Sequence, residues 1–504
     1  MVASKYAKRD MMESEFTQRA SQITPHGLGL SVDVYSPDVI LLAQRLHNEG
    51  LQPGYMEIFK ATTSALQWVR RRLPALKLTY HGEGLWVTQP EFLQSGSGRQ
   101  GVAEACAHIA ALGSAWLNHE CATKHMAGYA FGTYLPPLYT ALSASMTAEN
   151  LVYVQGQLDE QARRYENAST LVLLEMPPLT YFACGVLEIP AFFQAVTKQV
   201  ACGLVLDMGH LWTVYRYTGD WHKQTLTAFV AEFLDAFPME RVVEIHVAGL
   251  ATFTGCHVPD VHTDGSGLPQ WIDSHGSPIP EVLFDLLAQV LSHPRLTSLK
   301  GVALEVDTKP IAEIVSEFRR FVEQFQSKVP CSEQISCHDS LQRERREHVP
   351  GQAKGNVLTS DERAVLHRQY QAYVELVTTP ERMPMIAELS LLGGSLDDLN
   401  RYRDSYLPHE LLHWGGELTD MFPRTCVLLA AANIPLAQFI PFWFDKPRPE
   451  QEDYDFFLLK IDRFVEFVAG LCPVADSTVT EEAEELRAAY RAANEPIGSD
   501  EVHA

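Results

Sequence analysis

Short apolar runs alternate with longer amphipathic segments between residues 27 and 310 of the chain. The longer segments carry apolar residues at helical spacing, as in "PAFFQAVTKQV" at residues 190–200. The short runs are typical of buried strands: "GLGLSVDV" (27–34), "GYMEIF" (54–59), "LKLTYHG" (76–82), "AWLNHE" (115–120), "STLVLLEMP" (169–177), "CGLVLDMGH" (202–210), "VVEIHVAG" (242–249) and "LKGVALEVD" (299–307). This repeated strand–helix order predicts an α/β fold of the (β/α)8 or TIM-barrel type, for which about 250 to 300 residues is a normal length. A doubly wound open sheet is the alternative, but no glycine-rich phosphate loop follows the first run.

The pattern changes on both sides of this segment. We place an N-terminal extension at residues 1–24 and the barrel at residues 25–327. Residues 328–358 are polar and aperiodic, which predicts a linker. Helical periodicity returns in "DERAVLHRQYQAYVELV" and "YDFFLLKIDRFVEFVAGL". Residues 359–504 are therefore expected to form a smaller, mainly helical C-terminal domain with an acidic tail.

Composition narrows the class of protein. The formal net charge of −23 argues against a protein whose main task is to bind nucleic acid, because phosphate contacts require Lys and Arg surfaces. No stretch of about 18 uninterrupted apolar residues occurs, so we expect no membrane span. The nine cysteines are scattered and form no CxxC pair, which favours reduced thiols. We therefore expect a soluble, cytoplasmic protein with neither nucleic acid nor a membrane as its partner.

The carboxyl ends of the predicted strands carry an unusual number of His and acidic residues. In TIM-barrel enzymes these ends meet at one mouth, where the chemistry takes place. The side chains expected there are His81, His119, Glu120, Glu175, Asp207, His210, His246, Asp273, His275, Glu305 and Asp307. So many carboxylates in one place would repel one another, and bound cations would remove that cost. The nitrogen and oxygen donors fit two or three ions of zinc, manganese or iron, with Glu175 and Asp207 as the natural bridging ligands.

The wording around these residues resembles a known group, the multinuclear non-heme iron-dependent oxidative (MNIO) enzymes. These are typified by the methanobactin-maturing enzyme and belong with the xylose-isomerase and endonuclease IV-like TIM barrels. Members commonly read "GLGLR", "LHG", "LLEN", "CGLLLDVNN", "EIHLAGH", "DxHGxPVP" and "IEWD". Over residues 25–325 this chain reads "GLGLS", "YHG", "LLEM", "CGLVLDMGH", "EIHVAGL", "DSHGSPIP" and "LEVD" in the same order.

The resemblance implies two or three iron ions of mixed valence, with dioxygen as co-substrate. It implies oxidation of a Cys or Asp residue in a ribosomally made precursor peptide, or of an amino-acid-like substrate. The implied metal ligands are His81, His119, Glu175, Asp207, His210, His246, Asp273, His275 and Glu305. Glu120, Asp307 and His262 are the implied acid–base residues or partners of the ligands.

Several positions depart from the family wording. Asp33 is the only ligand type near the first strand, where the family usually has a His. The family's "SDH" or "SEH" becomes "NHE", which exchanges the order of His119 and Glu120. Met176 and His210 stand where Asn is common, and the second change moves the ligand set towards that of endonuclease IV.

Two other motifs invite a functional interpretation that the sequence around them does not favour. Glu166 in "YENAS" imitates the family's "LENVS", but no strand precedes it, and Glu175 is better placed. The HExxH pattern at His409, Glu410 and His413 could bind zinc on a helix. Pro408 and the following "WGG" favour a structural role there, although Glu417 lies one turn beyond His413.

Three functional hypotheses remain open at this point. The first is the iron-dependent oxidase or oxygenase just described. The second is a divalent-metal hydrolase or isomerase of the endonuclease IV or sugar-isomerase type, and the third is a barrel that serves only as a binding module. Family enzymes commonly work with a partner protein that presents the peptide, and the fused C-terminal domain is a candidate replacement for that partner.

Overall fold

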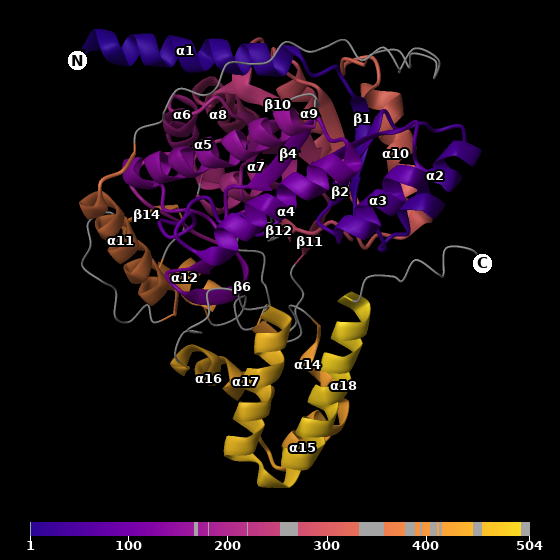
Figure 1. Ribbon diagram of the computed structural model, residues 1–504, viewed down its shortest axis with the longest axis vertical. Coiled ribbons are helices and arrows are strands. Elements are labelled where there is room, and N and C mark those ends of the chain that lie inside the picture. Colours follow the sequence, from indigo (N-terminus) through magenta and orange to yellow (C-terminus); the bar gives the residue numbers. More distant parts are fainter. Residues whose placement is uncertain are drawn as a thin grey trace.

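Eight parallel strands form a closed barrel at the centre of the computed structural model (Figure 1). The structure describes residues 2–165, 170–179, 181–218, 220–252, 271–331, 357–378, 389–393, 396–403, 411–412, 416–446 and 456–494. The barrel strands are β1 (Gly27–Val32), β2 (Tyr55–Phe59), β3 (Lys77–His81), β4 (Trp116–Glu120), β7 (Leu171–Glu175), β9 (Gly203–Asp207), β10 (Val242–Val247) and β13 (Gly301–Glu305). Each of the eight predicted runs contains one of these strands, and the pairing of β1 with β13 closes the barrel. The predicted TIM barrel is therefore confirmed.

Helices cover the outside of the barrel and side chains fill its interior, so both faces of each strand are buried. The helices are α2 (Val39–Asn48), α3 (Thr63–Arg72), α4 (Gly96–Leu112), α5 (Ala141–Arg164), α6 (Ile189–Thr197), α7 (Met208–Tyr217), α8 (Leu226–Ala236), α9 (Glu281–Leu291) and α10 (Ile311–Phe325). Because both faces of a parallel strand are covered, its sequence is a nearly continuous apolar run. β9 illustrates this, since all five residues of "GLVLD" are buried.

Helix α1 (Val2–Ser21) lies across the amino end of the barrel (Figure 1). Phe16 and Ala20 of this helix pack into an apolar cluster with Tyr55 and Trp116. The Arg19 guanidinium binds the Asp159 carboxylate on α5 at 2.7 and 2.8 Å. The expected N-terminal extension is thus a helix that seals one end of the barrel.

Short strands surround the opposite, carboxyl end. β5 (Thr123–Met126) and β6 (Tyr129–Leu135) form an antiparallel pair after β4, and β11 (Leu250–Thr252) pairs with β12 (Trp271–Asp273) after β10. β8 (Ala183–Cys184) pairs with β14 (Leu391–Gly393), which belongs to the C-terminal region. This end of the barrel is therefore built partly from residues distant in sequence.

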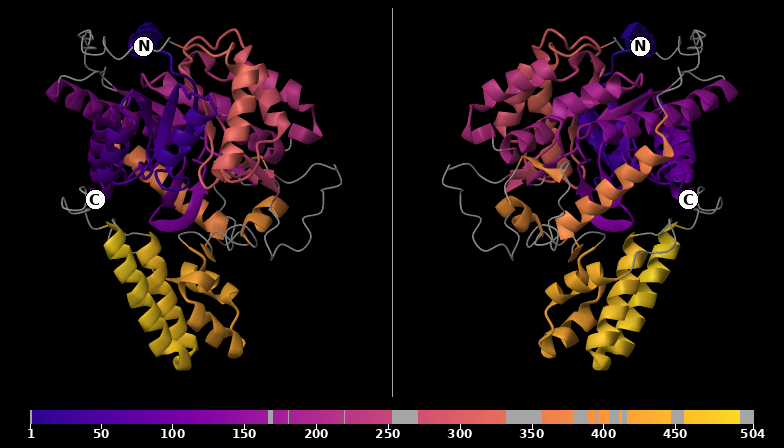
Figure 2. Two further views of the ribbon diagram at one scale, coloured as in Figure 1. Left: turned by 90° about the vertical axis from the view of Figure 1, so that its right-hand side faces the viewer. Right: turned by 90° about the vertical axis from the view of Figure 1, so that its left-hand side faces the viewer.

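The C-terminal region is mainly helical and lies on the carboxyl-end side of the barrel (Figures 1 and 2). Its elements are α11 (Ser360–Thr378), β14, α12 (Leu396–Arg401), α14 (Leu418–Met421), α15 (Pro423–Ala431), α16 (Phe439–Asp445), α17 (Phe456–Leu471) and α18 (Asp476–Asn494). Helix α11 packs on α5, where the hydroxyl groups of Tyr370 and Ser143 lie 2.9 Å apart. Helices α14–α18 project beyond the barrel and have their own aromatic core, which includes Phe422, Phe439 and Phe464. The mainly helical character predicted for this region is confirmed, whereas the small strand β14 was not expected.

No single helix in the described part of the chain is long and apolar enough to cross a membrane. The bent pair formed by α15 and residues 436–445 passes that test only by length and composition, with a bend of 100°.

Candidate metal centre

The end of strand β9 shows how the fold delivers polar groups to the barrel mouth. The side chain of Asp207 caps helix α7 by accepting the backbone N–H of His210 at 2.7 Å. This cap places His210 in the first turn of the helix, so that both side chains face the same end of the barrel. Both residues are nearly or fully buried, although carboxylates and imidazoles normally remain in water.

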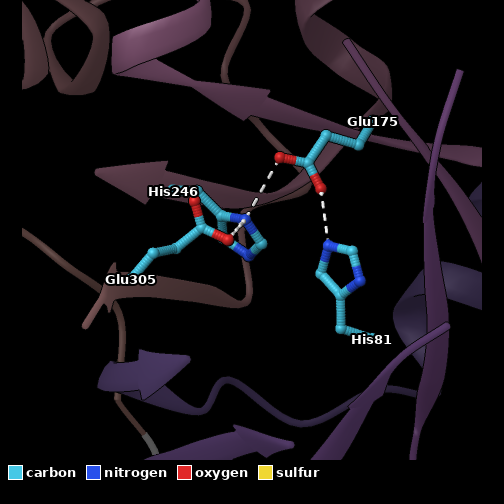
Figure 3. Close-up of side chains that lie close together, drawn as sticks. All are labelled: His81, Glu175, His246 and Glu305. Carbon is cyan, nitrogen blue, oxygen red and sulfur yellow. Dashed lines mark ion pairs between the residues drawn. The ribbon is translucent and has the colours of Figure 1, made fainter. Parts of the chain in front are cut away.

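Four ligand-type residues from four barrel strands meet inside the mouth (Figure 3). Glu175 lies between two imidazoles: its Oε2 is 3.3 Å from Nε2 of His81, and its Oε1 is 3.2 Å from Nδ1 of His246. Oε1 of Glu305 lies 3.2 Å from the same Nδ1 of His246. We call His81, Glu175, His246 and Glu305 the inner group. Its ligand atoms all lie within 4.8 Å of one another, which is the spacing of atoms that can share an ion.

A second set of ligand atoms lies beside the inner group. It contains Asp207, His210 and Asp273, which we call the outer group. Nε2 of His210 is 3.6 Å from Oδ2 of Asp273 and 3.9 Å from Oδ1 of Asp207. His275 adjoins this group, with its Nε2 3.3 Å from Oδ2 of Asp273.

Two carboxylates connect the groups. Oε1 of Glu175 is 3.9 Å from Nδ1 of His210, and Oε2 of Glu305 is 3.4 Å from Nε2 of His275. Glu175 therefore lies between the two groups, and its role as a bridging ligand stays a prediction. The bridging expectation for Asp207 receives no such support, because Asp207 caps α7 and lies in the outer group alone. Glu305 takes the second connecting position instead.

The structure does not bring His119 to either group. Its Nε2 accepts the backbone N–H of Leu85 at 2.8 Å, and its Nδ1 lies 2.7 Å from the carbonyl oxygen of Glu120. Burial lowers the pKa of His119 to about 4, which keeps the ring neutral and suits it to these two backbone contacts. A metal-ligand role for His119 thus stays a prediction without support from its contacts.

The expected acid–base residues have different positions. Glu120 ends β4, and the Tyr134 hydroxyl on β6 lies near it and donates to Oε1 of Glu83 at 3.1 Å. Oδ1 of Asp307 lies 2.6 Å from Nδ1 of His275 and so orients that imidazole towards Asp273. Five of the residues singled out in the sequence lie outside the described residues, namely His262, Glu166 and the HExxH residues His409, Glu410 and His413.

Two buried carboxylates were not predicted from the sequence. Glu57 on β2 and Glu244 on β10 are both fully buried, and together with His246 they form a third set of ligand-type atoms. They occupy positions inside their strands, whereas ligands were expected at strand ends. The signal that could have found them is a charged residue in an otherwise apolar run, as in "GYMEIF" and "VVEIHV".

Burial and neighbouring charges shift the pKa values of the carboxyl and imidazole groups at the mouth. Burial raises the pKa of Asp207 to about 8, and burial together with the charge of Glu175 raises that of Glu120 to about 7. Burial alone would lower the pKa of His81, but its hydrogen bond to Glu175 and the charge of Glu57 raise it to about 10. Protons thus compensate the negative charges in the metal-free protein, and a cation could take their place.

The orphaned atoms at the mouth fit metal ions. Oδ2 of Asp207, Oδ1 of Asp273 and both ring nitrogens of His246 are buried without a hydrogen-bond partner. An unpaired buried polar atom costs about 1–3 kcal/mol, and a coordinated ion removes that cost. The donors are imidazole nitrogens and carboxylate oxygens, a set that suits iron, zinc and manganese.

Comparison with known proteins identifies the family of the chain. The model of a family described as "RiPP precursor modification enzyme MbnB/TglH/ChrH" matches residues 27–326, which is more than half of the chain. The protein belongs to this MbnB/TglH/ChrH family. The family acts on precursors of ribosomally synthesised and post-translationally modified peptides, and its matched segment contains the whole barrel and both ligand groups.

Curated proteins with similar sequences match part of the chain. A UPF0276 protein of Caulobacter vibrioides (strain NA1000) is 28% identical over 304 residues, which are 59% of this chain and 93% of the relative. A UPF0276 protein of Caulobacter sp. (strain K31) is 31% identical over 151 residues, 28% of this chain and 48% of the relative.

Solved structures with a related architecture are more distant. Endonuclease IV from Thermus thermophilus has a TM-score of 0.35 and 16% identity, covering 59% of this chain and 99% of its own. A sugar phosphate isomerase/epimerase from Parabacteroides distasonis also has a TM-score of 0.35, with 13% identity, 61% of this chain and 96% of its own. The barrel assignment rests instead on the strand pairing described above.

The structure shows where two residues that depart from the common MbnB/TglH/ChrH sequence motifs lie. His210 faces Asp273 in the outer group, so the imidazole stands among ligand atoms. Asp33 follows β1, and burial together with the charge of Asp307 raises its pKa to about 6, while the charge of His275 lowers it. Asp33 therefore lies on the side of the mouth where His275 and Asp307 pair.

Proposed function

We propose that this protein is an iron-dependent oxidase or oxygenase that uses dioxygen to modify a residue of a ribosomally made precursor peptide. The observation that carries the proposal is the inner group, in which two imidazoles and two carboxylates from four barrel strands converge within 4.8 Å. The family match supports a peptide substrate. Cys and Asp are the residue types that we favour as targets, and an amino-acid-like substrate is the smaller variant of the same chemistry.

We assign two roles to the residues at the mouth: some would bind iron, and others would transfer protons. The inner group would hold one ion, and the outer group with His275 would hold a second, with Glu175 and Glu305 facing both. Iron bound there would supply the redox chemistry that activates dioxygen for oxidation of the substrate. Two ions satisfy both groups, and a third would need ligands beyond them.

Glu120 is the residue that we propose to exchange protons with the substrate. Its pKa of about 7, raised by burial and by the charge of Glu175, allows it to accept or release a proton near neutral pH. The Tyr134 hydroxyl lies near Glu120 and donates to Glu83, and the ammonium of Lys124 lies 2.5 Å from Glu83. On the other side of the mouth, Asp307 orients His275.

The C-terminal region is proposed to help present the peptide. Phe444 of α16 lies 6.3 Å from Phe131 of β6, and Tyr402 packs on Phe182 at 5.1 Å, so this region adjoins the mouth loops that follow β4 and β7. The buried contacts of α11 with α5 mean that removal from residue 359 onwards would expose barrel core. Deletion of residues 417–504 is the cleaner change, and we expect it to weaken peptide binding while the iron content stays the same.

Metal analysis after anaerobic purification tests the proposal. We expect two or three irons per chain, together with dioxygen consumption that depends on a precursor peptide encoded beside this protein. Stoichiometric zinc without iron would overturn the iron chemistry and would favour a hydrolase or isomerase. A His246→Ala variant that retained its full metal complement would show that the ligand assignment is wrong.

A further inference from the structure

His246 lies between two pairs of carboxylates in the barrel interior. Its Nδ1 faces the inner group, at 3.2 Å from Oε1 of both Glu175 and Glu305. Its Nε2 faces the opposite direction, at 3.1 Å from Oε1 of Glu57 and 3.6 Å from Oε2 of Glu244. All of these side chains are buried, so both pairs of carboxylates lie in the protein interior, away from solvent.

Glu57 and Glu244 each accept a hydrogen bond from a hydroxyl group, and glycines make room for one of the donors. Tyr55 donates its hydroxyl to Oε1 of Glu244 at 2.6 Å, and Ser31 donates its hydroxyl to Oε1 of Glu57 at 3.1 Å. Two glycines clear room for the Tyr55 ring, because a Cβ would lie 2.4 Å from Cε1 of Tyr55 at Gly29 and 2.6 Å from its hydroxyl at Gly301. A buried pair of carboxylates with dedicated partners carries a large desolvation cost, which calls for a role at the adjoining imidazole.

We propose that Glu57 is a positioning residue of the metal centre: its carboxylate, 3.1 Å from Nε2, would hold the proton of His246 on that nitrogen and so leave the Nδ1 lone pair for the inner-group ion. A neutral imidazole carries its proton on one nitrogen and a lone pair on the other. A ligand at Nδ1 therefore requires the proton at Nε2, and a carboxylate beyond a metal-bound imidazole fixes that tautomer. This inference rests on the proposed metal centre and is independent of the identity of the metal and of dioxygen.

Distance selects Glu57 rather than Glu244. Oε1 of Glu57 is 0.5 Å nearer to Nε2 than Oε2 of Glu244 is, by the difference of 3.6 and 3.1 Å. Each carboxylate also accepts one hydroxyl group, from Ser31 at Glu57 and from Tyr55 at Glu244, so hydrogen bonding does not separate the two. Because Glu57 is nearer, we expect replacement of Glu244 to affect metal binding less than replacement of Glu57.

The test uses full-length protein loaded with Zn²⁺, which is diamagnetic, together with Glu57→Gln, Glu244→Gln and Glu482→Gln variants. Glu482 is the matched control, because it is a buried carboxylate of the C-terminal region that binds Thr425 and Arg424. Chelator competition should show zinc affinity about 10- to 100-fold lower in Glu57→Gln, a smaller loss in Glu244→Gln and no change in the control. Long-range ¹H–¹⁵N spectra of histidine-labelled wild-type protein should show the His246 proton on Nε2.

Each other outcome is distinct. An unchanged zinc affinity in Glu57→Gln, or a His246 proton on Nδ1 in the wild type, overturns the positioning role even if the metal centre is real. Loss of one whole zinc equivalent with the remaining sites unaffected overturns it too, since Glu57 would then be a ligand. Wild-type protein that binds no metal would overturn the proposed centre itself. The wild-type spectrum decides the question even if Glu57→Gln fails to fold.

Discussion

Both ends of the barrel bury many of their side chains, but those side chains are opposite in character. At the amino end, Phe16 and Ile23 pack with Trp116 and other apolar residues beneath helix α1. At the carboxyl end, equally buried positions hold imidazoles and carboxylates such as Glu175 and Asp207, several with unpaired atoms. Burial stabilises the fold at the amino end, whereas it costs free energy at the carboxyl end.

This contrast teaches where stability and chemistry reside in the molecule. The apolar end contributes to folding alone, and TIM-barrel enzymes place their chemistry at the carboxyl end. The unpaired polar groups are therefore best understood as a site prepared for cations. If so, substitutions at the two ends should separate cleanly into effects on stability and effects on metal binding.

The largest expected effect is on metal binding in a Glu175→Gln variant. Glu175 faces His81, His246 and His210, and a neutral amide cannot supply two anionic oxygens to them. We expect metal affinity to fall by more than about 100-fold, beyond the loss typical of residues behind the ligands. Metal analysis after dialysis measures this, and circular dichroism should show an intact fold. A variant with full metal content would remove Glu175 from the centre.

The next largest effect is expected at the amino end, where a substitution should change the stability of the fold and not metal binding. Phe16 is almost fully buried against this apolar cluster, and the Arg241 guanidinium lies 4.4 Å above its ring. Phe16→Ala should lower the free energy of unfolding by about 3–5 kcal/mol and leave metal content unchanged. Met11→Ala on the same helix is the control, because Met11 is 46% exposed. Loss of metal in Phe16→Ala would show that the two ends are coupled.

A third expectation concerns pH. Burial holds the pKa of Glu120 at about 7 and that of Asp207 at about 8, both above the ordinary values near 4. A carboxyl group whose pKa is raised in this way stabilises the metal-free fold at low pH. This stabilisation is lost as the pH rises through 7 to 8. Metal ions displace these protons, so the apparent affinity should rise by up to about tenfold per pH unit for each proton displaced.

Thermal unfolding of metal-free and metal-loaded protein at pH 6 and pH 8 measures this difference. The melting temperatures should lie further apart at pH 8. His81 acts in the same direction: its pKa is raised to about 10, so across this window the folded metal-free protein binds this proton more tightly than the unfolded chain does. A gap that stayed constant would mean that protons and metal ions do not compete at the mouth.

The sequence predicted the barrel and most of the His and acidic side chains that converge at its mouth for a physical reason. Parallel strands buried on both faces are apolar runs, so an acid or imidazole at the end of a run, such as Glu175 or Glu305, stands out. Glu57 and Glu244 were missed because a charge inside a strand has no periodic signal and its partners are remote. The contacts of His119 were equally invisible, since Leu85 lies 34 residues away in a loop.

The smallest effect is expected for His210→Asn, which restores the residue that the family wording would place there. Only the outer group contains His210, whose Nε2 faces Asp273 at 3.6 Å, so the inner group should keep its ion. An Asn amide offers an oxygen that can still approach a cation, and we expect the outer ion to bind about tenfold more weakly or less. Titration of metal-free protein should then show one unchanged and one weakened site. Equal weakening of both sites would mean that Glu175 and Glu305 couple the groups so tightly that the inner and outer groups act as one cluster.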